Sequence, residues 1–345
     1  MNVRTILAAG LAFAAVVAAC GGDETADPVT LTLVTHDSFV VSDSVFAAFT
    51  DETGIEVRIL QGGDAGSALN QAILTKDNPE GDVFFGVDNT FVSRAFDNDL
   101  FVSYEAAGLD AIDPALVIDE QHRVTPIDTG DVCLNYDVEA LADLGVAPPT
   151  DLADLVTPEY AGLTVVQNPA SSSPGLAFLL ATVDRFGEDG WEDYWAGLRS
   201  NDVEVVAGWE DAYYGSYTVS GGDRPIVVSY ASSPAAEIVF AESPIDEPRS
   251  AVLLDSCFRQ IEFAGILANS PHPDEARQLV DFMLDDTFQA DLALNMFVYP
   301  VTDIALPEVF DDFAQLADTP LSLAPDVIAA RRDEWLSTWT DAVLR

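Results

Sequence analysis

Residues 31–39 read LTLVTHDSF, a short apolar run that ends in a polar cluster. The run 31–35 predicts a buried β-strand, and the polar group His-Asp-Ser begins directly after it. A helix is expected next, with Ser42 as its cap and Gly54 at its end. This strand–loop–helix unit sets the pattern of the chain.

The same unit recurs downstream. Strands are predicted over 55–60 and 83–87, with helices near 67–75 and from about residue 90. Strands that alternate with helices predict an α/β domain with a parallel sheet that helices cover. Composition agrees, because 49% of the residues are hydrophobic and a chain of 345 residues suits two domains or one large one.

A carboxylate follows each of these three strands, at Asp37, Asp64 and Asp88. In an open α/β sheet, ligands bind at the loops beyond the carboxyl ends of the strands. We therefore expect the three carboxylates to gather at one edge of the sheet and to form part of a ligand site.

A second α/β set follows Cys133. Strands are predicted over 163–167, 203–206 and 226–229, and a helix over 175–186. Polar and aromatic side chains again come directly after strands: Ser172, Trp209, Tyr213 and Tyr230. Later segments predict helices, the last of them over 325–344. The chain is thus expected to form two α/β domains, with the tail returning to the first.

The N-terminal segment 1–19 predicts a lipoprotein signal peptide. Arg4 precedes an apolar run that is too short for a stable membrane span, and small residues lead to Cys20. The junction VAAC resembles a lipobox, in which the cysteine becomes the lipidated first residue. Residues 20–29 would then be a lipidated N-terminus and linker, and the protein would be extracytoplasmic and anchored to the membrane by lipid alone. The alternative is an ordinary signal peptide with an incidental cysteine.

The formal net charge is -45, and Lys76 is the only lysine. Such a surface repels nucleic acid and anionic lipid, so neither is expected as a partner. The acidity fits a halophilic source, and it also fits a field that attracts cationic solutes. Charge alone does not separate these two interpretations.

Cys133 and Cys257 remain as a pair if Cys20 carries lipid. In an oxidising compartment they form either a disulfide or two buried free thiols, and the residues alone leave both open.

Catalysis has little support in this sequence. The chain has three histidines, and it lacks a G-x-S-x-G elbow, an H-E-x-x-H motif and a phosphate-binding P-loop. The serine run Ser171–Ser173 leaves an exported serine-dependent enzyme as an alternative, which requires a base within hydrogen-bond reach of a hydroxyl.

Tyr213 and Tyr214 suggest a second alternative, a receptor for ferric iron or another small cation. Adjacent residues on a helix point about 100° apart, so one tyrosine is expected in the core and the other at the surface. We therefore predict no metal site and no cofactor.

A binding cleft explains more residues than either alternative. Carboxylates come from the first half of the chain, and aromatic rings come from the second half and from Phe297. A ring face attracts a cation through its quadrupole, and a carboxylate supplies the opposite charge. The combination favours an organic cation as the ligand.

The ordered set of these segments resembles the thiamine-binding periplasmic protein family, the solute receptors of bacterial thiamine ABC transporters. The resemblance covers residues 31–345. It rests on the segments THDSF at 35–39, GVDN at 86–89, PIDTG at 126–130, QNP at 167–169, GWEDAY at 208–213, SY at 229–230 and YPV at 299–301.

The resemblance implies a two-lobed type II periplasmic-binding-protein fold, with the ligand in a cleft between lobes that crossover strands join. Lobe 1 would comprise 30–127 and a return segment, 257–345, and lobe 2 would comprise 128–256. It implies a monomeric, non-enzymatic receptor that takes thiamine or its phosphates and delivers it to permease subunits. It also places Cys133 and Cys257 near the crossovers, which favours their pairing.

Carried over by position, the resemblance places the following residues on the ligand site: Asp37, Asp64, Ser172, Trp209 and Tyr230. Phe297 stands where the family has a tryptophan. Ala236 stands where a tyrosine is expected to stack on the pyrimidine, so another ring has to replace it. Ser172 precedes a helix N-terminus, whose N–H groups would donate hydrogen bonds to a phosphate.

Overall fold

The computed structural model describes residues 29–345. The expected signal peptide, Cys20 and most of the linker lie outside the described residues. Within residues 29–345, no helix is long and apolar enough to cross a membrane.

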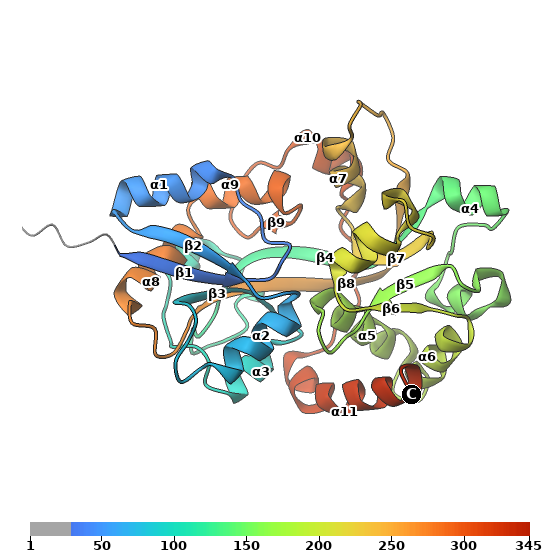
Figure 1. Cartoon of the computed structure of the whole chain (residues 1–345), viewed down its shortest axis with the longest axis horizontal. Helices are drawn as coiled ribbons and strands as arrows, with labels where there is room; N and C mark the ends of the chain where they lie inside the picture. The colour runs from blue at the N-terminus through green and yellow to red at the C-terminus, as the bar shows by residue number, and fades with distance from the viewer. Residues whose placement is uncertain (1–28) are drawn as a thin grey trace, which may run out of the picture.

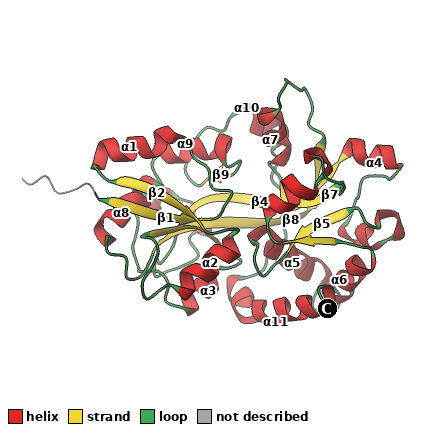
Figure 2. Ribbon diagram, in the orientation of Figure 1, coloured by secondary structure: helices red, strands yellow, loops and turns green. Residues whose placement is uncertain are grey.

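Lobe 1 is built on three parallel strands, and helices cover both faces of the sheet (Figures 1 and 2). The polar cluster that follows β1 and the N-terminus of α2 lie toward the other lobe. The strands are β1 (Thr30–Thr35), β2 (Glu56–Gln61) and β3 (Val83–Asp88). The helices are α1 (Asp43–Thr53), α2 (Ala65–Leu74), α3 (Val92–Asp97), α8 (Pro273–Phe282) and α9 (Asp286–Asn295).

Lobe 2 repeats the arrangement on the other side of the molecule (Figure 1). Its strands β5 (Thr164–Gln167), β6 (Glu204–Val206) and β7 (Ile226–Tyr230) are also parallel. Its helices are α4 (Val138–Leu144), α5 (Ser173–Phe186), α6 (Trp191–Ser200), α7 (Ser233–Phe240) and the π-helix η5 (Asp211–Ser216).

Two long strands, β4 (Thr125–Asp137) and β8 (Ser250–Ile266), run through the centre and join the lobes (Figure 1). They pair antiparallel with each other and with β7 and β3, so the strand order is β2-β1-β3-β8-β4-β7-β5-β6. The strands of the strand–helix units are parallel within each lobe, as the sequence predicts, and the two crossover strands add antiparallel pairs. Residues 252–254 and 258–263 both belong to the single strand β8. Between them the register of its pairing with β4 shifts, but the strand continues.

The C-terminal segment contributes β9 (Tyr299–Pro300), α10 (Glu308–Phe313) and α11 (Pro325–Val343). Trp335 and Trp339 of α11 are buried, and Trp339 meets Trp195 of α6 edge to face at 5.5 Å. Arg332 donates to Ser93 Oγ of α3 over 3.3 Å. The helix α11, predicted to belong to lobe 1, packs on α6 of lobe 2 and on α3 of lobe 1.

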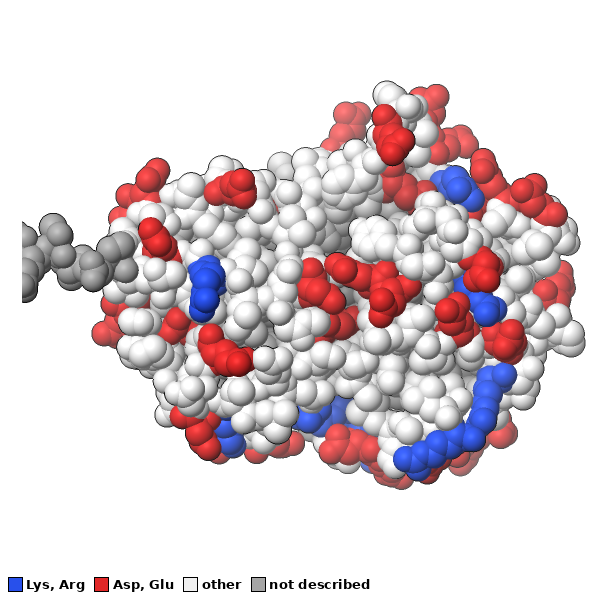
Figure 3. All heavy atoms as spheres, in the orientation of Figure 1, with Lys and Arg blue, Asp and Glu red and all other residues white. Residues whose placement is uncertain are grey.

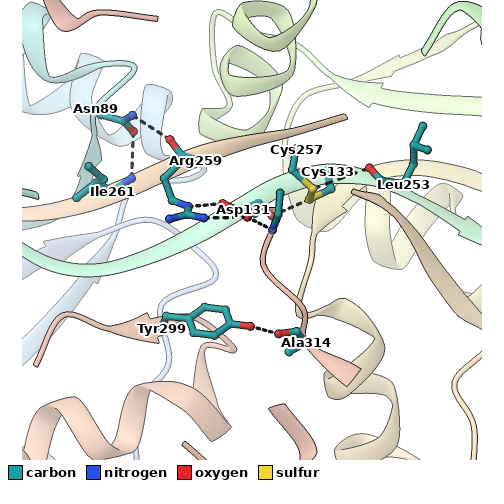
Figure 4. Close-up of polar contacts among 10 residues, drawn as sticks. Asn89, Asp131, Cys133, Leu253, Cys257, Arg259, Ile261, Tyr299 and Ala314 are labelled. Carbon is teal, nitrogen blue, oxygen red and sulfur yellow. Dashed lines mark hydrogen bonds and ion pairs between the residues drawn. A yellow bond between two sulfur atoms is a disulfide. The ribbon is translucent and has the colours of Figure 1, made fainter. Parts of the chain in front are cut away.

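A disulfide joins Cys133 of β4 to Cys257 of β8 where the two strands cross between the lobes (Figure 4). Beside it, the Asp131 carboxylate pairs with Arg259 and accepts the N–H of Ala317 over 2.8 Å. These contacts fasten the two crossover strands to each other and to the chain that leads to α11.

Candidate functional site

A cavity of about 290 Å³ lies at the junction of the two lobes. Acidic side chains are spread over the face shown in Figure 3, and basic ones are few. No Lys or Arg belongs to the described residues that line the cavity. The lining contains residues of both lobes and of the C-terminal segment: His36, Asp37, Ser38, Val40, Asp64, Ala65, Ser173, Pro174, Trp209, Glu210, Tyr213, Tyr214, Tyr230, Ser232, Ser233, Ala236, Phe240, Glu262, Asn295, Met296, Phe297 and Val298.

One wall of the cavity is aromatic and belongs to lobe 2. Trp209 stacks on Tyr213 with ring centroids 5.0 Å apart, and it meets Tyr230 edge to face at 6.3 Å. The indole N–H of Trp209 donates to Ser229 Oγ over 2.9 Å, which fixes the ring. The π-helix η5 places Tyr213 in the core and leaves Tyr214 58% exposed, yet both rings line the cavity.

A second group of rings lies around Phe297. Its centroid is 5.2 Å from that of Phe240 and 6.1 Å from that of Phe310. Phe240 is 65% exposed, which is unusual for a phenylalanine, and it lines the cavity one helical turn beyond Ala236 on α7. Sequence analysis noted Ala236 but missed Phe240, because only the tertiary structure places the end of α7 beside Phe297.

Asp37 lies at the rim of the cavity, after β1. Burial raises the pKa of its carboxyl, although N–H groups of the loop oppose this. Beside it, Ser38 Oγ donates to Glu210 Oε1 of lobe 2 over 3.5 Å. The rim is therefore acidic and is shared by both lobes.

Asp64 lies at the junction itself. Its carboxylate caps α2 by accepting the N–H of Ala65 over 2.7 Å. It also accepts the N–H of Ser173 over 3.1 Å and that of Trp209 over 2.9 Å, both from lobe 2. Burial raises its pKa to about 6, and these hydrogen bonds oppose the rise. Asp64 thus joins the lobes as well as lining the cavity.

The backbones of the two lobes approach each other closely beside Asp64. A Cβ added to Gly66 would lie 2.7 Å from the carbonyl oxygen of Ser171, so only glycine fits there. Ser67 N donates to that same carbonyl over 3.1 Å. The lobes are therefore in direct contact on one side of the cavity.

Ser172 and Asp88 lie behind the lining and not in it. Ser172 Oγ caps α5 by accepting the N–H of Gly175 over 3.3 Å. Asp88 is fully buried and accepts hydrogen bonds from Thr90, Phe91, Gln260 and Ser173. Both residues were expected at the site from their positions after strands, but their side chains turn to local backbone and buried polar groups.

The serine run offers no catalytic arrangement. Ser171 Oγ donates to the carbonyl of Ala207 over 2.6 Å, and Ser172 caps a helix. Ser173 Oγ donates to the carboxylate of Asp88 and Ser172 lies beside that of Asp64, but other donors already hold both carboxylates. Within residues 29–345, no group of three or more His, Cys, Asp or Glu side chains is arranged to hold a metal ion.

The floor of the cavity carries a carboxylate that sequence analysis missed. Glu262 of β8 lines the cavity, is 6% exposed, and lies 3.8 Å from His36 Nε2. Burial lowers the pKa of His36 to about 4, so this imidazole is neutral near pH 7. Asp128 lies opposite Glu262 on β4, fully buried. The sequence does offer one sign of this buried carboxylate, because Glu262 stands between the apolar residues Ile261 and Phe263.

Comparisons with known proteins agree with this architecture. Residues 78–318 match the family described as bacterial extracellular solute-binding protein. The thiamine-binding periplasmic protein of Salmonella typhimurium is 31% identical over 330 residues, which cover 94% of this chain and 97% of that protein.

Solved structures extend the comparison. A periplasmic thiamin binding protein superposes with a TM-score of 0.80 at 29% identity, covering 92% of this chain and 96% of the other. Iron-bound HitA from Pseudomonas aeruginosa superposes with a TM-score of 0.70 at 22% identity, covering 91% and 99%, and shows the fold alone.

These matches confirm the two-lobed fold and a solute-binding role outside the cytoplasm. The chain belongs to the bacterial extracellular solute-binding proteins, within the thiamine-binding periplasmic protein family.

Proposed function

We propose that this protein captures thiamine in the interlobe cavity and delivers it to the permease subunits of an ABC transporter. It would act as a monomer, tethered by lipid at Cys20, without catalysis. The observation that carries the proposal is the lining of the cavity, in which aromatic rings face carboxylates and the described residues include no Lys or Arg.

Thiamine has a flat aminopyrimidine and a permanently positive thiazolium. Rings such as Trp209 and Phe297 can stack on these heterocycles and remove them from water. A buried carboxylate compensates for the positive charge, and each charge-assisted contact contributes roughly 1.5–3 kcal/mol.

Phe240 is the ring that compensates for Ala236 in this proposal. It lies on the same face of α7, one turn later, and it reaches the cavity beside Phe297. Phe240 is 65% exposed, which fits a side chain that a bound ligand would cover.

The cavity favours thiamine over its phosphates. At the N-terminus of α5, the N–H of Ser173 is bonded to Asp64, that of Gly175 is bonded to Ser172, and Pro174 has none. The Asp64 carboxylate therefore occupies the position at which this helix end would attract an anion.

Calorimetric titration with thiamine tests the proposal. We expect one-to-one binding, and we expect Trp209→Ala to weaken it by about 1 kcal/mol or more through loss of stacking. Phe186→Ala is the control, because this ring lies on α5 against Tyr194 and outside the lining. Folded protein that does not bind thiamine would contradict the proposal, and ferric iron would then be titrated.

A further inference from the structure

We propose that Glu262, together with Asp128, is the anionic group that recognises the positive charge of the ligand, and that the pair gives up one shared proton when the cation binds. The inference rests on the proposed function and names the charge-recognition group of the same cavity. It is carried by the register of the crossover strands and by the missing hydrogen-bond partners of the pair.

The register places carboxylates side by side on three neighbouring strands. Glu262 of β8 lies opposite Asp128 of β4 and, on its other side, opposite Asp88 of β3. Directly opposed residues on antiparallel strands point to the same face of the sheet with Cβ atoms about 5 Å apart. Three acidic side chains thus form a row across the centre of the sheet, where the lobes meet.

The members of this row differ in their hydrogen bonds. Asp88 is satisfied by donors that include Thr90 Oγ1 at 2.7 Å and Gln260 Nε2 at 3.0 Å. Both carboxylate oxygens of Asp128 are buried, and among residues 29–345 the hydrogen-bonding neighbour of this carboxyl is the Glu262 carboxyl itself. His36 Nε2, at 3.8 Å from Glu262, is also buried without a partner.

Such a pair does not stay doubly ionised in an empty cavity, because a buried charge without donors is costly and two like charges repel. Burial raises the pKa of Asp128 to about 7, and burial and the Asp128 charge raise that of Glu262 well above its usual value. Near neutral pH the two carboxyls therefore hold one proton between them.

The surroundings offer no cation to replace that proton. The groups that face Glu262 are His36 from the β1 loop, Asp64 from α2, Asp88 from β3, Asp128 from β4 and Tyr230 from β7. The imidazole is neutral, the phenol is neutral because burial raises its pKa, and the others are acids. None of these described groups carries a positive charge near pH 7, so the ligand has to bring it.

A permanent cation placed over Glu262 lowers the pKa of the pair, and the shared proton leaves to solvent. Binding of one thiamine cation thus releases up to one proton at pH 7, and affinity rises with pH up to the pKa of the empty pair. A neutral ligand of the same shape releases none.

Glu262→Gln tests this, because it keeps the shape of the side chain and removes the charge. The purified wild-type and variant proteins are titrated with thiamine and with its neutral analogue, in which thiophene replaces the thiazolium. We expect the variant to bind thiamine about tenfold more weakly or worse, while its affinity for the neutral analogue changes less than about threefold. Equal losses for both ligands, or no loss, would overturn the assignment.

Proton release provides a readout that a purely structural role of Glu262 would not change. Titration at pH 7 in two buffers with different ionisation enthalpies counts protons, and we expect release in the wild type and a smaller release in Glu262→Gln, in which Asp128 is the one remaining carboxyl of the pair. Glu262→Asp keeps the charge and should retain a preference for the cation. Glu192→Gln is the charge control, because it removes one exposed carboxylate from α6 and should change neither affinity nor proton count.

The two proposals fail in different ways. A wild-type protein that does not bind thiamine overturns the proposed function and this inference with it. A wild type that binds thiamine without releasing a proton, or that binds thiamine and its neutral analogue equally, overturns the role of Glu262 and Asp128 alone.

Discussion

Asp88 and the pair Asp128 and Glu262 lie in one row across β3, β8 and β4, yet their environments are opposite. Asp88 accepts hydrogen bonds from backbone and side chains and does not line the cavity. Within residues 29–345 the two carboxyls of the pair have only each other as hydrogen-bond partners, and Glu262 lines the cavity. Burial raises the pKa of all three carboxyls, so burial alone does not distinguish them. Their hydrogen-bond partners distinguish them. A carboxylate with many donors stabilises the fold, whereas one without them is available to a ligand.

Removing the charge of Asp88 should have the largest effect on stability. Asp88→Asn keeps an oxygen for Thr90 and Phe91 but places an amide NH2 where Oδ2 accepts from Ser173 Oγ and Gln260 Nε2, so we expect a loss of about 2–4 kcal/mol in the free energy of unfolding. Denaturant unfolding followed by circular dichroism measures it. A variant as stable as the wild type would show that these hydrogen bonds do not distinguish Asp88 from the pair.

Removing the charge of Glu262 should instead increase the stability of the protein. In the ligand-free protein we expect Glu262→Gln to raise the free energy of unfolding by about 1 kcal/mol at pH 8, because it removes a buried repulsion. An acid whose folded pKa is raised contributes stability at low pH that is lost as pH rises through the folded pKa. The advantage of the variant should therefore be small at pH 5 and grow toward pH 8. A difference that does not depend on pH would contradict the shared proton.

Asp64 lies between these extremes, because it accepts three N–H groups and also lines the cavity. If its carboxylate keeps phosphate from the end of α5, the wild type should bind thiamine monophosphate more weakly than thiamine. Asp64→Asn should reduce the difference in binding free energy between the two ligands by about 0.5–1 kcal/mol, which is the smallest of these effects. Competition titrations with both ligands measure this difference. If it is unchanged or larger in Asp64→Asn, Asp64 is not the cause of the discrimination against phosphate.

Several residues of the cavity wall could be predicted from the sequence, because a strand followed by polar or aromatic residues marks the ligand edge of an α/β sheet. Asp37, Trp209, Tyr213 and Tyr230 all line the cavity. The same pattern placed Asp88 at the site, where only the hydrogen bonds in the structure show that its side chain is already held.

The residues that were missed depend on contacts between distant segments. Glu262 lies in mid-strand, so no loop pattern marks it, and it becomes notable only when register places it opposite Asp128. Phe240 is at the end of α7, and its role depends on Phe297, far along the chain. The antiparallel course of β4 and β8 was likewise hidden, since a crossover strand has the same local pattern as any other.

The most direct test of the central claim is the affinity of the wild-type protein for thiamine, measured by calorimetry beside its affinity for the neutral thiophene analogue. An unpaired acidic floor beneath aromatic walls predicts that the cation binds at least about tenfold more tightly than the neutral molecule of the same shape. Equal affinities would contradict the account, because the cleft would then recognise rings alone and the carboxylates beneath it would have no part in binding.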